Sequence, residues 1–153
     1  MKYIMRLLFK TTLYSILTFY LCGCGEAKKD KVTYHAHELD TVPYSESVLV
    51  GDILYISGQI ANIKGDYNKI VEGGIQPQVN QAMTNIENIL KKYDATMDEI
   101  VKCTCILANG DDWGKMSEEY VKFFKSHRPA RTTFGGAELG DGILVEIECI
   151  AKI

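Results

Sequence analysis

The chain has 153 residues, of which 46% are hydrophobic and 24% are charged, and its formal net charge is −3. This length predicts one domain with its own hydrophobic core. The acidic balance argues against a nucleic-acid partner, because binding to a phosphate backbone requires a basic surface.

The N-terminal segment has the pattern of an export signal. Lys2, Arg6 and Lys10 precede the uncharged run 11–21, which is shorter than the roughly 20 residues of a membrane-spanning helix and suits the core of a secretory signal. Leu21-Cys22-Gly23-Cys24 then resembles the bacterial lipobox, which directs lipid attachment to its final Cys.

From this pattern we predict a lipoprotein-type signal peptide at residues 1–23, lipidation at Cys24, a polar tether at 24–32 and a folded domain at 33–153. The protein would then be exported and anchored to a membrane of a bacterial envelope by its lipid alone. Removing the signal also removes three positive charges, so the net charge moves from −3 to −6. An uncleaved anchor and an ordinary signal cut nearby are the alternatives, and the protein is cytoplasmic if the signal is not used.

The first half of the domain contains strand patterns. Residues 32–37 alternate weakly and predict an edge strand. Two apolar runs, 47–50 and 53–57, flank Gly51-Asp52 and predict a hairpin with a two-residue turn. Residues 58–60 extend the second strand, and 62–68 are predicted to form a loop.

From residue 75 the hydrophobic period changes to that of a helix. The predicted apolar face carries Ile75, Val79, Met83, Ile86, Leu90 and Tyr93, and the polar face carries Gln78, Gln81, Asn85, Asn88 and Lys92. Thr96 and Glu99 have the spacing of a capping box.

The second half predicts a strand at 101–107 with Val101, Cys103, Cys105 and Leu107 on one face. Residues 109–112 form a loop that ends at a helix N-cap. Trp113, Met116, Tyr120, Phe123 and Phe124 trace the apolar side of a second helix that ends near Ser126, and two strands follow.

This order of elements predicts an α+β fold in which both helices cover one face of a mixed sheet. The opposite face is partly apolar, so we expect sister subunits to cover it.

Cys103, Cys105 and Cys149 are predicted to be buried free cysteines. Cys103 and Cys105 are two residues apart on one strand, a spacing that rarely satisfies disulfide geometry. His35, His37 and His127 lie too far from any Cys pair to predict a zinc site, so no metal is expected.

Arg131 opens one predicted strand and Glu146 lies in the middle of the next. Two ionisable groups on neighbouring strands, each framed by apolar residues, indicate a site for a small anion. A guanidinium can hold a carboxylate through two charge-assisted hydrogen bonds.

Four short motifs occur in order along the domain: Pro43-Tyr44, Ser57-Gly58-Gln59-Ile60, Pro129-Ala130-Arg131 and the strand from Glu146 to Ala151. Together they resemble the RidA/YjgF family, the enamine/imine deaminases, over residues 33–153. The resemblance implies a chorismate-mutase-like fold, a homotrimer with sites between subunits, and no metal or organic cofactor. It also implies hydrolysis of 2-imino and 2-enamino acids, such as 2-aminoacrylate, to 2-oxo acids and ammonia.

The same resemblance implies roles for individual residues. Arg131 would hold the substrate carboxylate and Glu146 would handle the attacking water. Tyr44 would close the pocket, Ser57 would bind the substrate or position water, and Gly58 would let the backbone approach the ligand. The backbone N–H of Thr133 would contact the substrate.

The chain departs from the family at two of these positions. Thr133 stands where many relatives carry Cys, and Asp111 stands where close relatives often carry Asn. These changes, and the exported location, leave an alternative open: a non-catalytic trimer that binds a small carboxylate or acts as a chaperone-like surface protein.

Overall fold

The computed structural model describes residues 29–63 and 66–153. The predicted signal peptide, Cys24 and most of the tether lie outside the described residues. Within those two ranges, no helix is both long and apolar enough to cross a membrane.

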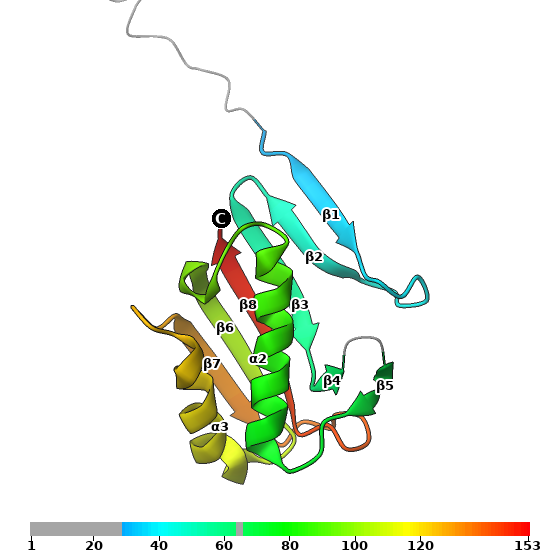
Figure 1. Ribbon diagram of the computed structural model, residues 1–153, viewed down its shortest axis with the longest axis vertical. Helices are drawn as coiled ribbons and strands as arrows, with labels where there is room; N and C mark the ends of the chain where they lie inside the picture. The colour runs from blue at the N-terminus through cyan, green and yellow to red at the C-terminus, as the bar shows by residue number, and fades with distance from the viewer. Residues whose placement is uncertain (1–28, 64–65) are drawn as a thin grey trace, which may run out of the picture.

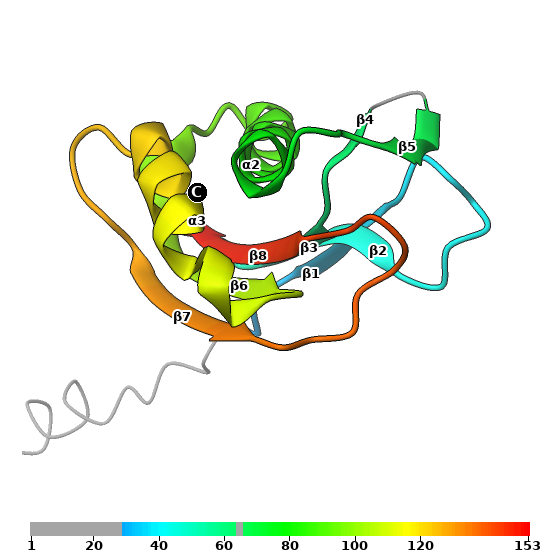
Figure 2. The ribbon, with the colours of Figure 1, turned by 90° about the horizontal axis from the view of Figure 1, so that it is seen from below.

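A six-stranded mixed sheet carries two α-helices on one face, as predicted (Figure 1). The strand order is β1 (Val32–Ala36), β2 (Ser45–Val50), β3 (Ile53–Gln59), β8 (Val145–Lys152), β6 (Ile100–Leu107) and β7 (Ala130–Gly135). Neighbouring strands are antiparallel except β6 and β7, which are parallel. The helices are α2 (Ile75–Lys91) and α3 (Trp113–Tyr120), and Figure 2 shows both on the same side of the sheet.

The core lies between this side of the sheet and the helices. The apolar stripe of α2 is buried as predicted, with Val79, Met83, Ile86 and Leu90 at 0% exposure against the inward-facing residues of β3, β6 and β8. Burial of this face is the main source of the stability of the helix, because short helices are marginal in water. The capping box of Thr96 and Glu99 is present and opens a 3₁₀ turn at Met97–Glu99.

Gln78 is a correction to the predicted polar face of α2. Its side chain is 3% exposed; the Nε2 amide donates to the carbonyl of Gly142 at 2.7 Å, and Oε1 accepts from the N–H of Leu144 at 2.8 Å. These two bonds tie the loop before β8 to the helix, so a polar residue on this face is structural rather than solvated.

Two further details differ from the sequence prediction. The expected loop at 62–68 contains a small hairpin, β4 (Asn62–Ile63) and β5 (Asp66–Ile70). Val101 is 47% exposed, because an irregularity between Ile100 and Lys102 gives the buried position to Ile100. Both are consequences of strand pairing, which a local hydrophobic pattern does not encode.

The second helix is also shorter than predicted. The predicted loop 109–112 contains a 3₁₀ turn, Gly110–Asp112, in which Oδ1 of Asn109 accepts from the N–H of Asp111. Asp112 at the end of this loop is the N-cap of α3, as predicted, but its side chain makes no capping hydrogen bond. The α-helix ends at Tyr120 and a 3₁₀ turn, Val121–Phe123, follows. Trp113, placed by the prediction on the apolar side, is 47% exposed.

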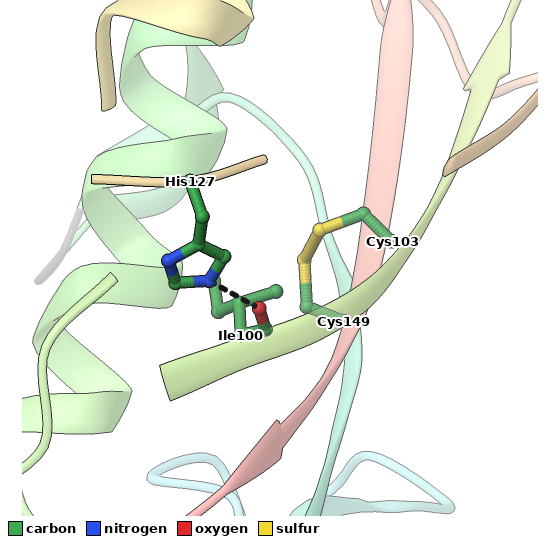
Figure 3. Close-up of a disulfide and its surroundings, with 4 residues drawn as sticks. All are labelled: Ile100, Cys103, His127 and Cys149. Carbon is green, nitrogen blue, oxygen red and sulfur yellow. Dashed lines mark hydrogen bonds between the residues drawn. A yellow bond between two sulfur atoms is a disulfide. The ribbon is translucent and has the colours of Figure 1, made fainter. Parts of the chain in front are cut away.

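The prediction that all three domain cysteines are free is wrong. Cys103 on β6 and Cys149 on β8 form a disulfide (Figure 3). The antiparallel register places these residues directly opposite each other, with their Cα atoms 4.2 Å apart. Their distance along the chain, 46 residues, does not reveal this pairing. Cys105 is buried and free, as predicted.

The face of the sheet opposite the helices, called the open face below, carries exposed apolar side chains. One row across it runs Tyr34, Val48, Tyr55, Ile150 and Lys102 in cross-strand register. Tyr34 is 72% exposed and Tyr55 is 47% exposed. Such a surface is typical of a face that associates with another protein surface.

Candidate active site

Glu146 lies against Gly58, and the absence of a side chain at Gly58 makes room for it. A Cβ atom at Gly58 would collide with Oε1 of Glu146 and lie 2.8 Å from its Cδ. The bulge that turns Gly58 toward Glu146 consists of Ser57 and Gly58, which lie between the paired residues Ile56 and Gln59. The sequence prediction was that Gly58 lets the backbone approach a ligand. In the structure, the group that lies next to Gly58 is the Glu146 carboxylate.

The Glu146 carboxylate has neither a hydrogen bond nor an ion pair with any residue of the ranges 29–63 and 66–153. Its cross-strand neighbour on β6 is Ile106, so an apolar side chain lies beside it on the open face. A partly buried carboxylate without a fixed donor can accept a proton from water.

Gly58 and Tyr44 line one pocket of about 240 Å³, called the Tyr44 pocket below. Its apolar lining residues include Leu39, Val42 and Ile60, and its polar lining residues include His37, Asn62 and Tyr67. Asn85 on α2 holds this region in place, since its Nδ2 amide donates to the carbonyls of Ile60 and Asn62, both at 3.1 Å. Ser57 donates its hydroxyl to the carbonyl of Ser45 at 2.7 Å, so only its oxygen lone pairs remain for a ligand.

Arg131 lies on the helix-covered face and contacts α3. Its Nη2 donates to the Ser117 hydroxyl at 3.0 Å, and the guanidinium carbon lies 5.0 Å from the centre of the Tyr120 ring and 6.0 Å from that of Trp113. These contacts fix the direction of the guanidinium while leaving most of its donors unused.

Thr133 shares this face two residues further along β7. Its Oγ1 is buried and has no hydrogen-bond partner among the described residues, and the same is true of the Tyr120 hydroxyl. Burial raises the pKa of the Cys105 thiol to about 11, and the positive charge of Arg131 opposes this rise. Burial also raises the pKa of Tyr120. Both groups are therefore neutral at pH 7.

Arg131 and Glu146 do not meet within one protomer. The prediction placed them on neighbouring strands, but β6 lies between β7 and β8. Arg131 pairs with Cys103, whose side chain is in the core, whereas Glu146 alternates with the buried Val145 and Ile147 and points to the open face. The fold therefore separates the predicted site residues into two groups, called half-sites below: Tyr44, Ser57, Gly58 and Glu146 are in one group, and Arg131 and Thr133 are in the other.

Comparison with known proteins identifies the family. The family model described as Endoribonuclease L-PSP matches residues 36–153. The chain belongs to this family. It is 38% identical to the human 2-iminobutanoate/2-iminopropanoate deaminase over 109 residues, which are 71% of this chain and 79% of that protein. The structure is similar to yeast Mmf1, with a TM-score of 0.72, 30% identity, and coverage of 80% of this chain and 98% of that one. It is also similar to RidA from an Antarctic Psychrobacter, with a TM-score of 0.67, 29% identity, and coverage of 80% and 98%.

Membership of the L-PSP family confirms the resemblance to RidA that the four motifs carry. The sequence prediction missed the residues that orient these motifs. Ser117 and Tyr120 contact Arg131. In the sequence, a Tyr at helical spacing predicts core packing, and a Ser on the same helix predicts no particular role. His37 and Tyr67 line the Tyr44 pocket, and only the fold brings them beside Tyr44.

Two further observations bear on the chemistry of this family member. Asp111, the departure noted above, is exposed in the 3₁₀ turn before α3. Among the described residues, no three His, Cys, Asp or Glu side chains gather in a way that would hold a metal ion.

Proposed function

We propose that this protein hydrolyses 2-imino and 2-enamino acids to 2-oxo acids and ammonia. The observation that carries the proposal is the unpaired Glu146 carboxylate, which lies against Gly58, a residue that lines the Tyr44 pocket. The relatives named imine deaminases support it.

In this proposal Arg131 holds the substrate carboxylate. Its guanidinium is oriented by Ser117 and Tyr120, so the entropy lost on binding is small. The backbone N–H of Thr133, two residues further along β7, is the second contact. Tyr44 closes the pocket over the substrate, and Ser57 accepts a hydrogen bond from the substrate or the water.

The reaction begins with the iminium ion, the protonated form of the imine, and an enamine reaches that form by gaining a proton at C3. Glu146 accepts a proton from water as the water oxygen bonds to C2, and the electron pair of the C=N π bond moves to nitrogen. Glu146 then returns the proton to nitrogen. The C–N bond breaks with its electrons on nitrogen, ammonia leaves, and loss of the hydroxyl proton gives the 2-oxo acid. Positioning of water and carboxylate supplies most of the acceleration, because imines also hydrolyse unaided.

The two half-sites must come together for this chemistry, and we propose that a second copy of the chain completes each site in a homotrimer. The exposed apolar row on the open face, with Tyr34 and Tyr55, supports such an assembly. Light scattering tests it: a mass near three protomers supports the trimer, and a stable monomer contradicts it.

The activity is tested on purified residues 25–153 with imines generated by an amino-acid oxidase, following the loss of imine. Arg131→Ala and Glu146→Gln should each lower kcat/KM by about 100-fold, as expected for loss of a charge clamp or a positioned base. Arg128→Ala and Glu148→Gln are matched controls, because both residues are exposed neighbours of the same type. No acceleration by the wild-type protein would refute the deaminase activity, and binding of 2-oxobutanoate without turnover would favour the non-catalytic alternative.

RNA cleavage is a separate arm of this experiment, because the family description names an endoribonuclease. The net charge of −3 disfavours a phosphate-backbone substrate. We expect single-stranded RNA to remain intact under conditions in which the imine is consumed.

We also propose that the protein is exported and lipidated at Cys24, as the signal pattern predicts. The disulfide between Cys103 and Cys149 supports export, because such bonds persist mainly in oxidising compartments. Metabolic labelling with a palmitate analogue should mark the wild-type chain but not Cys24→Ala. Equal labelling of both, or of neither, contradicts lipidation at this residue.

A further inference from the structure

His37 follows β1 directly and lies in the Tyr44 pocket between two aromatic rings. Its ring centre is 5.8 Å from that of Tyr44, at an interplanar angle of 74°, and 5.3 Å from that of Tyr67. Edge-on and tilted arrangements of this kind are favourable contacts between aromatic rings. His37 is therefore the residue that links Tyr44 to the rest of the pocket.

His37 and Tyr67 are each held by a hydrogen bond. Nδ1 of His37 accepts the N–H of Leu39 at 3.0 Å, so the neutral ring carries its proton on Nε2. The Tyr67 hydroxyl donates to the Glu38 carboxylate at 2.8 Å. Burial, together with the hydrogen bond to Glu38, raises the pKa of Tyr67 to about 12, so this hydroxyl remains a donor at neutral pH.

Tyr44 itself has little else to hold it. It is 53% exposed, and its hydroxyl has no hydrogen bond to any residue within 29–63 and 66–153. An exposed aromatic side chain without such contacts samples several rotamers, and ordering it on ligand binding costs free energy. A residue that fixes the ring beforehand would strengthen binding.

We propose that His37 is a positioning residue that holds the Tyr44 ring over the pocket and thereby strengthens substrate binding. This inference rests on the proposed function of the pocket. His37 acts through Tyr44 and takes no part in the transfer of protons between water and substrate.

Two substitutions distinguish the contribution of the His37 ring from the contribution of its hydrogen bond to Leu39. His37→Asn keeps an acceptor for the Leu39 N–H and removes the ring, whereas His37→Phe keeps the ring and removes the acceptor. We expect His37→Asn to raise KM by about three- to tenfold with kcat nearly unchanged, and His37→Phe to restore most of the loss. His127→Asn, which replaces a histidine outside this pocket, should leave both constants unchanged.

A double-mutant cycle tests whether His37 acts through Tyr44. In a Tyr44→Ala background, His37→Asn should have no further effect, because the ring that His37 holds is gone. Fully additive effects would overturn the proposal.

A structural measurement keeps this test independent of the proposed activity. Crystal structures of the wild-type protein and His37→Asn should show the Tyr44 ring ordered in the first and displaced or disordered in the second. An unchanged Tyr44 ring overturns the positioning role, whether or not the protein hydrolyses imines. An ordered ring in the wild type, a displaced ring in the variant and no imine hydrolysis would refute the proposed function alone.

Discussion

The two faces of the sheet differ in how completely the elements of this chain cover them. On the helix-covered face, α2 and α3 bury a continuous core, and even Arg131 has fixed neighbours in Ser117 and Tyr120. On the open face, Tyr34 and Tyr55 are exposed, and the Glu146 carboxylate has no partner among the described residues.

This difference explains why the proposed catalytic groups are divided. A face closed by its own helices can orient a guanidinium, whereas an open face keeps a carboxylate available until a second surface covers it. The stability of the protomer therefore depends on the first face, and the proposed catalysis depends on both.

The largest expected effect is on the helix-covered face. Reducing the Cys103–Cys149 disulfide, or replacing both cysteines with Ala, should lower the free energy of unfolding by about 3–4 kcal/mol, because the bond closes a loop of 46 residues in the unfolded chain. Denaturant unfolding with and without dithiothreitol measures this loss in the free energy of unfolding. The double Ala variant should not respond to reductant, and a wild-type protein indifferent to reductant would contradict the role of the bond.

The second effect concerns the open face. Gly58→Ala should displace the Glu146 carboxylate, since the new Cβ would overlap it, and lower kcat/KM by about 100-fold. Gly114→Ala is the matched control, because a Cβ there meets no atom within 4 Å. Equal activity of the two variants would show that the position of Glu146 does not matter.

The third prediction concerns the two hydrogen bonds between α2 and the loop before β8. Gln78→Ala should cost about 2 kcal/mol, because it leaves the Leu144 N–H and the Gly142 carbonyl without their partner in a partly buried loop. Gln76→Ala, on the same helix with one exposed bond of 3.3 Å, should change stability by less than about 0.5 kcal/mol. Thermal unfolding of both variants distinguishes a structural Gln78 from a solvated one.

The smallest effect is the pH dependence of the turn before β6. Hydrogen bonds from the Thr96 hydroxyl and backbone N–H lower the pKa of Glu99 from its usual 4.5. The stabilisation is therefore complete above pH 4.5 and is lost as the pH falls through the lower folded-state pKa. Glu99→Gln should melt slightly below the wild type at pH 7 and match it at pH 2, and an equal difference at both pH values would contradict this assignment.

The sequence predicted the local features well. The hairpin at Gly51, the apolar face of α2 and the capping box at Thr96 all follow from periodicity and turn chemistry. Each depends on residues close together in the chain.

The failures depend on strand pairing. The register of β6 and β8 creates the disulfide, and the placement of β6 between β7 and β8 separates Arg131 from Glu146. The buried role of Gln78 arises from a loop more than 60 residues away. None of these is encoded in a local pattern, because each is decided by which distant segments become neighbours.

Mixing two inactive variants tests the division of the site most directly. Arg131→Ala and Glu146→Gln protomers are unfolded together, refolded at equal concentration and assayed for imine hydrolysis. If each site takes Arg131 from one protomer and Glu146 from its neighbour, random trimers regain about a quarter of wild-type activity, because one interface in four receives both intact residues. If the mixture stays as inactive as the separate variants while wild-type protein refolds to full activity, the two residues do not act across an interface, and the account of a divided site is wrong.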